Sequence, residues 1–314
     1  MSQENQTFSS DFILLGIFGH SPTQTILFSL VLGVFSVAFV GNMTMVLFIC
    51  LDTWLHTPMY FLLSQLSLMD LMLICTIVPK MAFNYLSGSK SISVASCGAQ
   101  IFFYLSLLGA ECFLLAVMAY DRYVAICHPL RYSVLMSQKI CCLMAASSWI
   151  LGSIDGIIHV AVVLSFSYCG AREIPNFFCD VPALLTLSCT STLLFERTIF
   201  ICCVVMLLLP LAVIIASYAH VILAIIRMGS GEGHRKAFTT CSSHLTVVGM
   251  YYGAAMFIYM RPVSDHSPTQ DKVVSAFYTI LTPMLNPLIY SLRNKEVARA
   301  LMKVLGKDKI KTEL

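Results

Sequence analysis

Residues Met118–Tyr132 read M-A-Y-D-R-Y-V-A-I-C-H-P-L-R-Y, and this stretch decides the fold. The residues before it, Ile101–Ala119, are almost wholly apolar and cover most of a bilayer crossing. Asp121 and Arg122 then appear with no polar residues ahead of them, and Pro129 halts the helix. Charges at the end of a membrane helix are tolerated when they are paired, because each neutralises the other. The stretch therefore indicates a helix that leaves the membrane at a charge pair able to act as a switch.

The composition excludes a soluble globular protein. The chain has 314 residues, of which 58% are hydrophobic and 11% are charged, and its mean hydropathy is +0.83. Soluble domains carry roughly 25% charged residues, so this chain cannot enclose its core in a solvated surface. The net charge of +3 is too small to indicate a nucleic-acid partner. Residues 1–24 contain no Lys or Arg ahead of an apolar segment, so we expect no cleaved signal peptide.

Seven apolar windows are long enough to cross a bilayer. They lie near 25–50, 58–84, 98–126, 140–164, 196–226, 238–260 and 272–292. The sequence therefore predicts an all-α membrane protein whose seven-transmembrane helix bundle occupies 25–292, between an N-terminal segment at 1–24 and a tail at 293–314. An odd number of spans places the two termini on opposite sides of the membrane.

The Lys and Arg residues indicate which terminus faces the cytoplasm. Thirteen of the 19 lie on the side of the C-terminus and six on the side of the N-terminus. Because basic residues concentrate on the cytoplasmic side, we expect an extracellular N-terminus and a cytoplasmic C-terminus. The Asn5-Gln6-Thr7 sequence would then be a glycosylation acceptor. Basic and apolar residues alternate helically from Lys295 to Leu305, which predicts an amphipathic helix on the inner membrane surface.

Two carboxyl residues lie deep in apolar sequence, Asp70 in the second span and Glu111 in the third. Each costs on the order of 3 kcal/mol at membrane depth. Sharing a sodium ion or a proton would lower that cost. The alternative is two separately hydrogen-bonded, protonated acids that only pack helices together.

The fourth span carries small and polar residues that need partners. Gly152 and Gly156 have the spacing that lets helices approach closely, so they face either a second copy or, as we favour, a neighbouring helix of the same bundle. Asp155 and His159 lie four residues apart on one helix face, and we expect them to pair. In the first span, Asn42 should face other helices because it is a strong hydrogen-bonding group in lipid.

The last span contains a backbone break near its cytoplasmic end. Pro287 cannot donate to the helical ladder, and we expect Asn286 beside it to bond the groups that Pro287 frees. Tyr290 follows one turn later and should point a hydroxyl into the core. A kink that can re-pair its backbone groups is a candidate moving part.

The cysteines divide into two sets by location. Four lie on the predicted outer side, where disulfides form, and four cysteines allow three connectivities; they are Cys97, Cys169, Cys179 and Cys189. Four sulfur-bearing side chains lie within the membrane spans: Cys112, Cys202, Cys203 and Met206. They suggest a thiol or a metal-assisted odorant as the ligand. We do not favour this hypothesis, because Cys and Met are common in membrane helices.

Several motifs in the correct order resemble those of olfactory (odorant) receptors, which are rhodopsin-like G-protein-coupled receptors. They are L-H-T-P-M-Y at Leu55–Tyr60, M-A-Y-D-R-Y-V-A-I-C at Met118–Cys127, K-A-F-T-T-C-S-S-H at Lys236–His244 and P-M-L-N-P-L-I-Y at Pro283–Tyr290. Thr239 stands where the family usually has Ser, a change that keeps the hydroxyl group.

The resemblance implies an odorant receptor rather than an enzyme. Such a receptor binds small, mostly apolar volatile molecules in the outer half of the bundle and activates a stimulatory G protein that raises cyclic AMP. It would be a multi-pass protein of the plasma membrane, in the cilia of olfactory sensory neurons. The resemblance also selects the disulfides Cys97–Cys179 and Cys169–Cys189, and it implies a sodium-type site at Asp70 and Glu111 near Asn286.

The implied site residues fall into a ligand set and a switch set. Turn counting back from Arg122 and the family analogy place ten residues around the ligand: Tyr104, Leu105, Leu108, Cys112, Cys202, Met206, Tyr252, Ala255, Tyr259 and Thr279. Ordinary interhelical packing is the alternative for any one of them, and we expect about half to contact ligand. The resemblance assigns the switch to Asp121, Arg122, Tyr123, Tyr218, Asn286, Pro287 and Tyr290.

Other classes fit the sequence less well. A retinal pump needs a lysine in the middle of the last span, and here Lys272 lies only at its outer end. The sequence does not divide into two matching halves, as the sequences of inverted-repeat transporters do. We expect no cofactor apart from a sodium ion. The closest alternative is a non-olfactory class A receptor for a small lipid-like or metabolite ligand. Beyond odorant, G protein and membrane lipid, an export chaperone or a second receptor in a dimer stays open as a partner.

Overall fold

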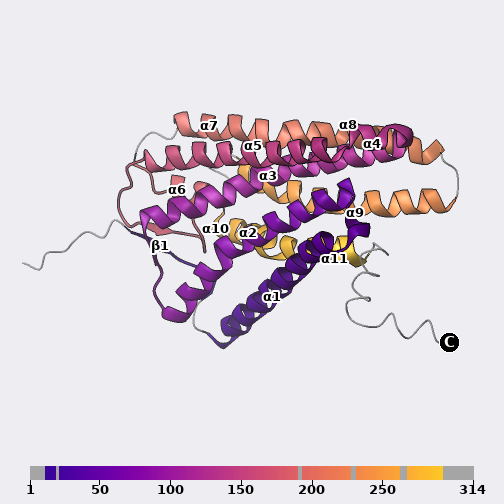
Figure 1. The fold of residues 1–314 in the computed structure, drawn as a ribbon. Helices are drawn as coiled ribbons and strands as arrows, with labels where there is room; N and C mark the ends of the chain where they lie inside the picture. Colours follow the sequence, from indigo (N-terminus) through magenta and orange to yellow (C-terminus); the bar gives the residue numbers. More distant parts are fainter. Residues whose placement is uncertain (1–10, 19–20, 190–192, 228–230, 262–266, 293–314) are drawn as a thin grey trace, which may run out of the picture.

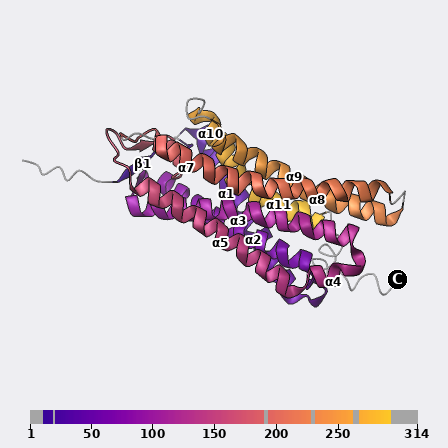
Figure 2. The ribbon, with the colours of Figure 1, turned by 90° about the horizontal axis from the view of Figure 1, so that it is seen from above.

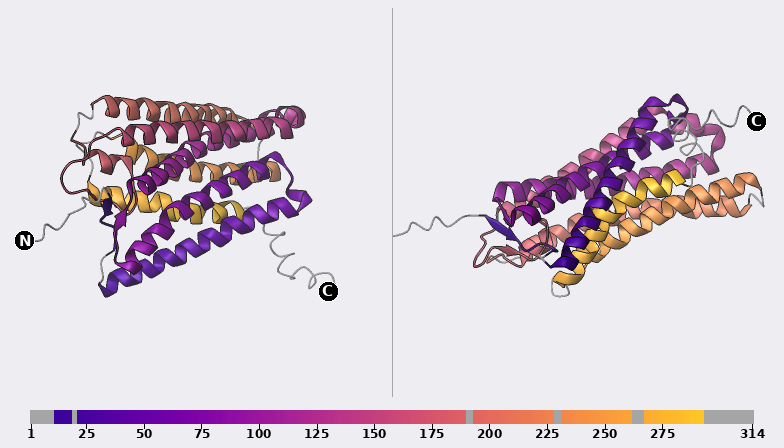
Figure 3. Two further views of the ribbon diagram at one scale, coloured as in Figure 1. Left: turned by 60° about the vertical axis from the view of Figure 1, so that its left-hand side comes forward. Right: turned by 90° about the horizontal axis from the view of Figure 1, so that it is seen from below.

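The computed structural model describes residues 11–18, 21–189, 193–227, 231–261 and 267–292. Seven long helical segments run alongside one another through these ranges, as Figures 1 and 3 show. The glycosylation acceptor Asn5 and the predicted amphipathic helix and tail at 293–314 lie outside the described residues.

Five of the seven segments are single helices. They are α1 (Pro22–Leu51), α2 (Pro58–Ser87), α3 (Val94–Cys127), α5 (Gln138–Leu164) and α9 (Glu232–Tyr259).

The other two segments each contain one π-helical stretch. One joins α7 (Leu193–Cys203), η3 (Val204–Leu208) and α8 (Leu209–Arg227), and the other joins α10 (Pro268–Ala276), η5 (Phe277–Leu281) and α11 (Thr282–Leu292). Short connecting elements complete the described helices: η1 (Thr53–Leu55), η2 (Pro129–Arg131), α4 (Tyr132–Leu135) and α6 (Val181–Leu185).

Six of the helical stretches in the described ranges are long and apolar enough to cross a membrane. The helix outside this group is α9, which begins with the polar stretch that includes Lys236–His244. Its apolar residues lie in its second half and pack into the common core, among them Val247, Val248 and Tyr251. A polar start therefore lowers the hydropathy of α9 without removing it from the bundle.

Local sequence signals explain where the helices begin and end. Ser21 caps α1 by accepting a hydrogen bond from the backbone N–H of Gln24, and Pro22 fills the first helical position, where no donor is needed. Ser93 caps α3 in the same way through the N–H of Ser96. Gly88 ends α2 with a φ of 70°, a left-handed conformation that glycine adopts without strain.

The helix α3 lies at the centre of the bundle and packs closely against α5. A β-carbon on Gly152 would lie 2.6 Å from the backbone nitrogen of Ala110, and one on Gly156 would lie 2.8 Å from the carbonyl oxygen of Phe102. Only glycine fits at such contacts. Gly152 and Gly156 therefore pack within the same bundle, the arrangement that the sequence favoured over a dimer face.

A small sheet and two disulfides cover one end of the bundle, which we call the disulfide end. The sheet has the order β2-β1-β3, with β1 (Phe12–Leu14) antiparallel to β2 (Ser91–Ile92) and parallel to β3 (Glu173–Ile174). The disulfides are Cys97–Cys179 and Cys169–Cys189, the pairs that the resemblance implied. Figure 2 shows α4 at the opposite end, which we call the Arg122 end.

Candidate ligand and signalling site

At the Arg122 end, one carboxylate holds two partners. Asp121 is almost fully buried, forms an ion pair with Arg122, and accepts a hydrogen bond from the Tyr132 hydroxyl at 2.7 Å. Burial, followed by the nearby Asp121 carboxylate, raises the pKa of the Tyr132 phenol above its ordinary value. Tyr132 therefore stays protonated and donates throughout the physiological pH range. The loop residue Tyr132 was not among the predicted switch residues, because sequence alone does not show that α4 folds back onto α3.

The predicted switch residues do not all meet. The Tyr218 hydroxyl on α8 is hydrogen bonded to Nδ1 of His244 on α9 at 2.8 Å, which ties these two helices together. Tyr123 points elsewhere, since its hydroxyl lies 2.9 Å from Nε2 of His128. The buried Tyr290 hydroxyl has no hydrogen-bond partner within the described part of the chain, so it is available to a new one.

The backbone break at Pro287 is repaired from a different helix than the sequence indicated. Pro287 has no N–H, so the Pro283 carbonyl one turn earlier loses its helical donor. The Nδ2 group of Asn42, on α1, donates to that carbonyl at 2.7 Å. The expectation that Asn286 fills this role is therefore wrong, because Asn286 donates to both carboxylate oxygens of Asp70, at 2.9 and 3.2 Å.

Asp70 and Glu111 are both buried, but they are not hydrogen bonded to one another in the described structure. Asp70 is held by Asn286, whereas Glu111 interacts with Tyr278 and keeps Oε1 without a hydrogen-bond partner among the described residues. An unsatisfied buried oxygen is costly and suits either a shared proton or a cation. The sodium or proton site stays a prediction.

A cluster of tyrosines joins three helices in the half of the bundle nearer the disulfide end. The Tyr251 hydroxyl donates to the Leu108 carbonyl, and the Tyr252 hydroxyl donates to the Cys112 carbonyl at 3.1 Å. Tyr278 donates to Tyr251 at 3.5 Å. Sequence reasoning missed Tyr251 and Tyr278, although Tyr251 stands directly beside the predicted ligand residue Tyr252 and both tyrosines of this pair bond to α3.

The ten predicted ligand residues are referred to below as the predicted wall. Eight of them are buried in the bundle interior: Tyr104, Leu105, Leu108, Cys112, Met206, Tyr252, Ala255 and Thr279. Several contact one another or the loop above, as where the Tyr104 ring packs edge-on against Phe178 at 5.0 Å. A β-carbon on Gly109 would lie 2.5 Å from the methyl of Met206, so the methionine fills the space that glycine leaves.

Cys202 has neighbours that the sequence did not indicate. Its sulfur lies with the side chains of Asp155 and His159 on α5. Sequence reasoning placed Cys202 with the wall by analogy and could not detect this contact, because the rotation of α7 depends on the π-helical stretch η3 that follows it.

The loop at the disulfide end is tied to the helices beneath it. The Tyr259 hydroxyl on α9 donates to the Asp180 carboxylate at 3.0 Å, and the backbone N–H of Cys179 donates to Gln100 Oε1 on α3 at 2.8 Å. Together with the Cys97–Cys179 bridge, these contacts hold Phe177 and Phe178 buried over the tyrosine cluster. The described part of the loop therefore covers Tyr104 of the predicted wall.

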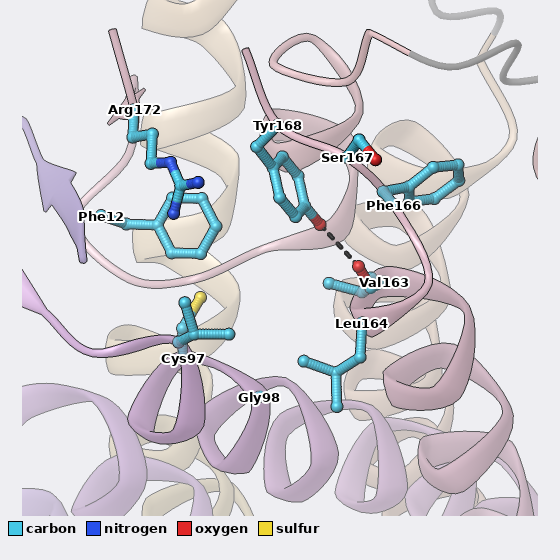
Figure 4. A pocket seen from close by; sticks show the side chains of 10 residues that line it. Phe12, Cys97, Gly98, Val163, Leu164, Phe166, Ser167, Tyr168 and Arg172 are labelled. Atoms are coloured by element: carbon cyan, nitrogen blue, oxygen red, sulfur yellow. Dashed lines mark hydrogen bonds between the residues drawn. The ribbon is translucent and has the colours of Figure 1, made fainter. Parts of the chain in front are cut away.

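A separate cavity of about 330 Å³ lies at the disulfide end of the bundle, where α3 begins and α5 ends, beside β1 (Figure 4). The Arg172 guanidinium lies over the Phe12 ring at its edge, and the Tyr168 hydroxyl donates to the Val163 carbonyl at 2.8 Å. Burial raises the pKa of Tyr168 to about 12, so this phenol is neutral at physiological pH. The cavity contains no residue of the predicted wall.

The amino-acid sequence matches a known protein family. A sequence model described as olfactory receptor matches residues 30–308. This chain belongs to the olfactory receptor family. Human olfactory receptor 2M3 is 77% identical to it, over 98% of this chain and 99% of that protein. Human olfactory receptor 2M2 is 76% identical over 100% of this chain and 90% of that protein, and mouse olfactory receptor 2V1 is 59% identical over 98% and 97%.

Membership of the olfactory receptor family confirms the protein class that the sequence predicted. The receptor is a multi-pass membrane protein with the seven-transmembrane fold, and olfactory receptors are not enzymes. The family also implies odorant ligands and coupling to a G protein in general. The recognition of the family from its motifs is thus confirmed, and the non-olfactory class A alternative is set aside.

Proposed function

We propose that the receptor binds small, mostly apolar volatile molecules between α3, η3, α9 and η5, and that binding activates a stimulatory G protein to raise cyclic AMP. The observation that carries this proposal is the buried wall beneath the closed loop. Six of its ten residues have side chains of carbon or sulfur alone. The hydroxyls of Tyr252 and Thr279 are bonded to backbone carbonyls, and that of Tyr259 is bonded to Asp180. The Tyr104 hydroxyl has no hydrogen-bond partner among the described residues. Apolar pockets with few free polar groups suit neutral apolar ligands.

The signalling step in this proposal is a population shift between two packings of the helices. The Asp121–Arg122 ion pair and the Tyr132 hydrogen bond favour the packing described above. An odorant that fits a rearranged wall better would favour the other packing, in which Arg122, Tyr218 and Tyr290 form new contacts. The unpartnered hydroxyl of Tyr290 supports its inclusion in that set.

The same proposal places the receptor in the plasma membrane of olfactory sensory neurons, with segment 1–24 outside and the tail from residue 293 inside. Glycosylation at Asn5 and an amphipathic helix in the tail belong to it. So does a sodium ion or a proton at Asp70 and Glu111. Dimerisation through Gly152 and Gly156 is excluded from it, because α3 occupies that face.

The test is the cyclic AMP response of cells that express the full chain, measured across a panel of volatile compounds. An Arg122→Ala variant with equal surface expression serves as the control. We expect a concentration-dependent rise in cyclic AMP that is lost in the variant. A response that survives Arg122→Ala would overturn the proposed route from the wall to the G protein.

A further inference from the structure

Three potential metal ligands of different chemistry meet between α5 and α7. They are a carboxylate, an imidazole and a thiol, from Asp155, His159 and Cys202, and their ligand atoms all lie within 4.8 Å of one another. Asp155 and His159 are less than a tenth exposed, and Cys202 is partly buried. We call these three residues the α5–α7 cluster.

The local geometry brings the three side chains to one point. Asp155 and His159 lie one turn apart on the same face of α5, and Nδ1 of His159 lies 2.9 Å from the Asp155 carbonyl oxygen and 3.5 Å from its carboxylate. The other carboxylate oxygen faces Gly109 on α3, at 3.7 Å from the position that a β-carbon there would take. The imidazole and the carboxylate are thus already adjacent before any ion binds.

The position of Cys202 depends on the π-helical stretch just after it. The π stretch η3 begins at Val204 and so adds one residue to a turn within the same long helix. One extra residue rotates everything before it by about 100° relative to an uninterrupted α-helix. That rotation turns Cys202 toward α5, and π-helical insertions are frequent at functional sites.

Distances and charge both suit a divalent ion. Zinc bonds of about 2.0–2.3 Å in a tetrahedral arrangement place neighbouring ligand atoms roughly 3.5 Å apart. The ligand atoms of the cluster lie within 4.8 Å of one another, so side-chain movements of about 1 Å would bring them to that spacing. One carboxylate and one thiolate cancel the charge of a dication, and a neutral site is what an apolar interior tolerates.

We propose that Asp155, His159 and Cys202 bind one divalent ion of the zinc class, with three protein ligands and one open coordination position. Mixed N, O and S ligands match the borderline character of zinc, whereas magnesium and calcium take oxygen alone. The ion joins α5 to α7 one helical turn from Met206, a residue of the predicted wall. The proposal does not depend on the proposed odorant function, because ion binding is measurable without an odorant.

Cobalt(II) is the probe for the first measurement, because its bond to a thiolate produces a charge-transfer absorption band. The band disappears when zinc displaces the cobalt. The experiment titrates the purified full chain in lipid nanodiscs. We expect one zinc-displaceable cobalt per receptor in the wild type and in Cys203→Ser, a neighbouring buried cysteine outside the cluster. Cys202→Ser should abolish the charge-transfer band, and His159→Ala should weaken cobalt binding at least tenfold. A wild type without the band, or a band unchanged in Cys202→Ser, would overturn the proposal.

Thermal unfolding supplies a second readout on variants that fold. An ion that binds only the folded state raises the unfolding midpoint, and the rise grows with the logarithm of the ion concentration above its Kd. Zinc should raise the midpoint of the wild type and of Cys203→Ser, a chelator should reverse the shift, and Cys202→Ser should show none. Equal shifts in Cys202→Ser and the wild type would place the ion elsewhere and refute the assignment.

Discussion

Asn42 illustrates how much one side chain contributes in a membrane interior. Its amide donates to the carbonyl that Pro287 leaves without a helical partner, and it links α1 to α11 across 241 residues of sequence. Water cannot replace this donor inside a bilayer, so the bond satisfies a group that would otherwise stay unpaired. The stability of the last span near its proline therefore depends on a residue of the first.

Replacing this amide should destabilise the bundle. We expect Asn42→Leu to lower the free energy of unfolding by about 1–3 kcal/mol, because the Pro283 carbonyl would be buried without a donor. The check is the thermal unfolding midpoint in detergent. Ser36→Ala is the matched control on the same helix, since its hydroxyl only bonds back to Leu32 of its own helix. Equal midpoints for both variants would contradict the assignment.

The hydroxyl of Tyr132 should restrain signalling from the Arg122 end. Tyr132→Phe removes a hydrogen bond to the Asp121 carboxylate, and bonds to charged acceptors are worth roughly 1.5–3 kcal/mol. We expect ligand-independent cyclic AMP to rise several-fold at equal surface expression. Tyr168→Phe is the control, because its hydroxyl donates to the Val163 carbonyl at the disulfide end of the bundle. The idea fails if the two variants show the same basal signal.

At the scale of the helices, hydropathy indicates where the spans lie, whereas close approach and helix rotation determine which residues of two helices meet. The apolar windows indicated seven spans, and α9 carries the weakest signal because its first half is polar. Hydropathy does not encode the two π-helical stretches, η3 and η5, which rotate the first part of a helix relative to the rest. Turn counting along α3 selected four residues that are buried in the bundle, whereas it cannot be carried across a π-helical stretch; the four are Tyr104, Leu105, Leu108 and Cys112.

The contact between α3 and α5 should not tolerate a single added methyl group. In Gly156→Ala the new β-carbon would lie 2.8 Å from the Phe102 carbonyl oxygen, and such overpacking typically costs about 1–3 kcal/mol. We expect a lower unfolding midpoint and reduced surface expression. Gly253→Ala on α9 is the matched control, because nothing lies within 4 Å of its β-carbon position. A harmless Gly156→Ala would show that the helices are not this close.

At the scale of the whole molecule, the bundle is closed at one end and held by polar contacts at the other. The loop between α5 and α7 is bonded to α3 through Cys97–Cys179 and to α9 through Tyr259 and Asp180. These contacts join three segments that are distant in sequence, and in the proposed function they lie above the odorant site. The helix α9 is also bonded to α8, because His244 lies 2.8 Å from the Tyr218 hydroxyl.

Opening the cover should change odorant potency rather than the maximal response. Tyr259→Phe removes the hydrogen bond to Asp180, and we expect the half-maximal odorant concentration to rise about tenfold because bound ligand escapes faster. Dose–response curves of cyclic AMP provide the measurement. Tyr168→Phe is the control, since its hydroxyl bonds only within the outer loop and the end of α5. Overlapping curves for the wild type and Tyr259→Phe would rule out this role.

The amino-acid sequence alone determined the class of the protein. Apolar windows of bilayer length require membrane helices, and motifs such as M-A-Y-D-R-Y identify the family, because both depend on residues close together in the chain. The tertiary structure decided which polar group meets which. Asn42 rather than Asn286 bonds the carbonyl freed by Pro287, and the Cys202 sulfur lies with the side chains of Asp155 and His159. These partners depend on helix rotation and on backbone approach at glycines, which are set by packing over the whole bundle and leave no local signal in the sequence.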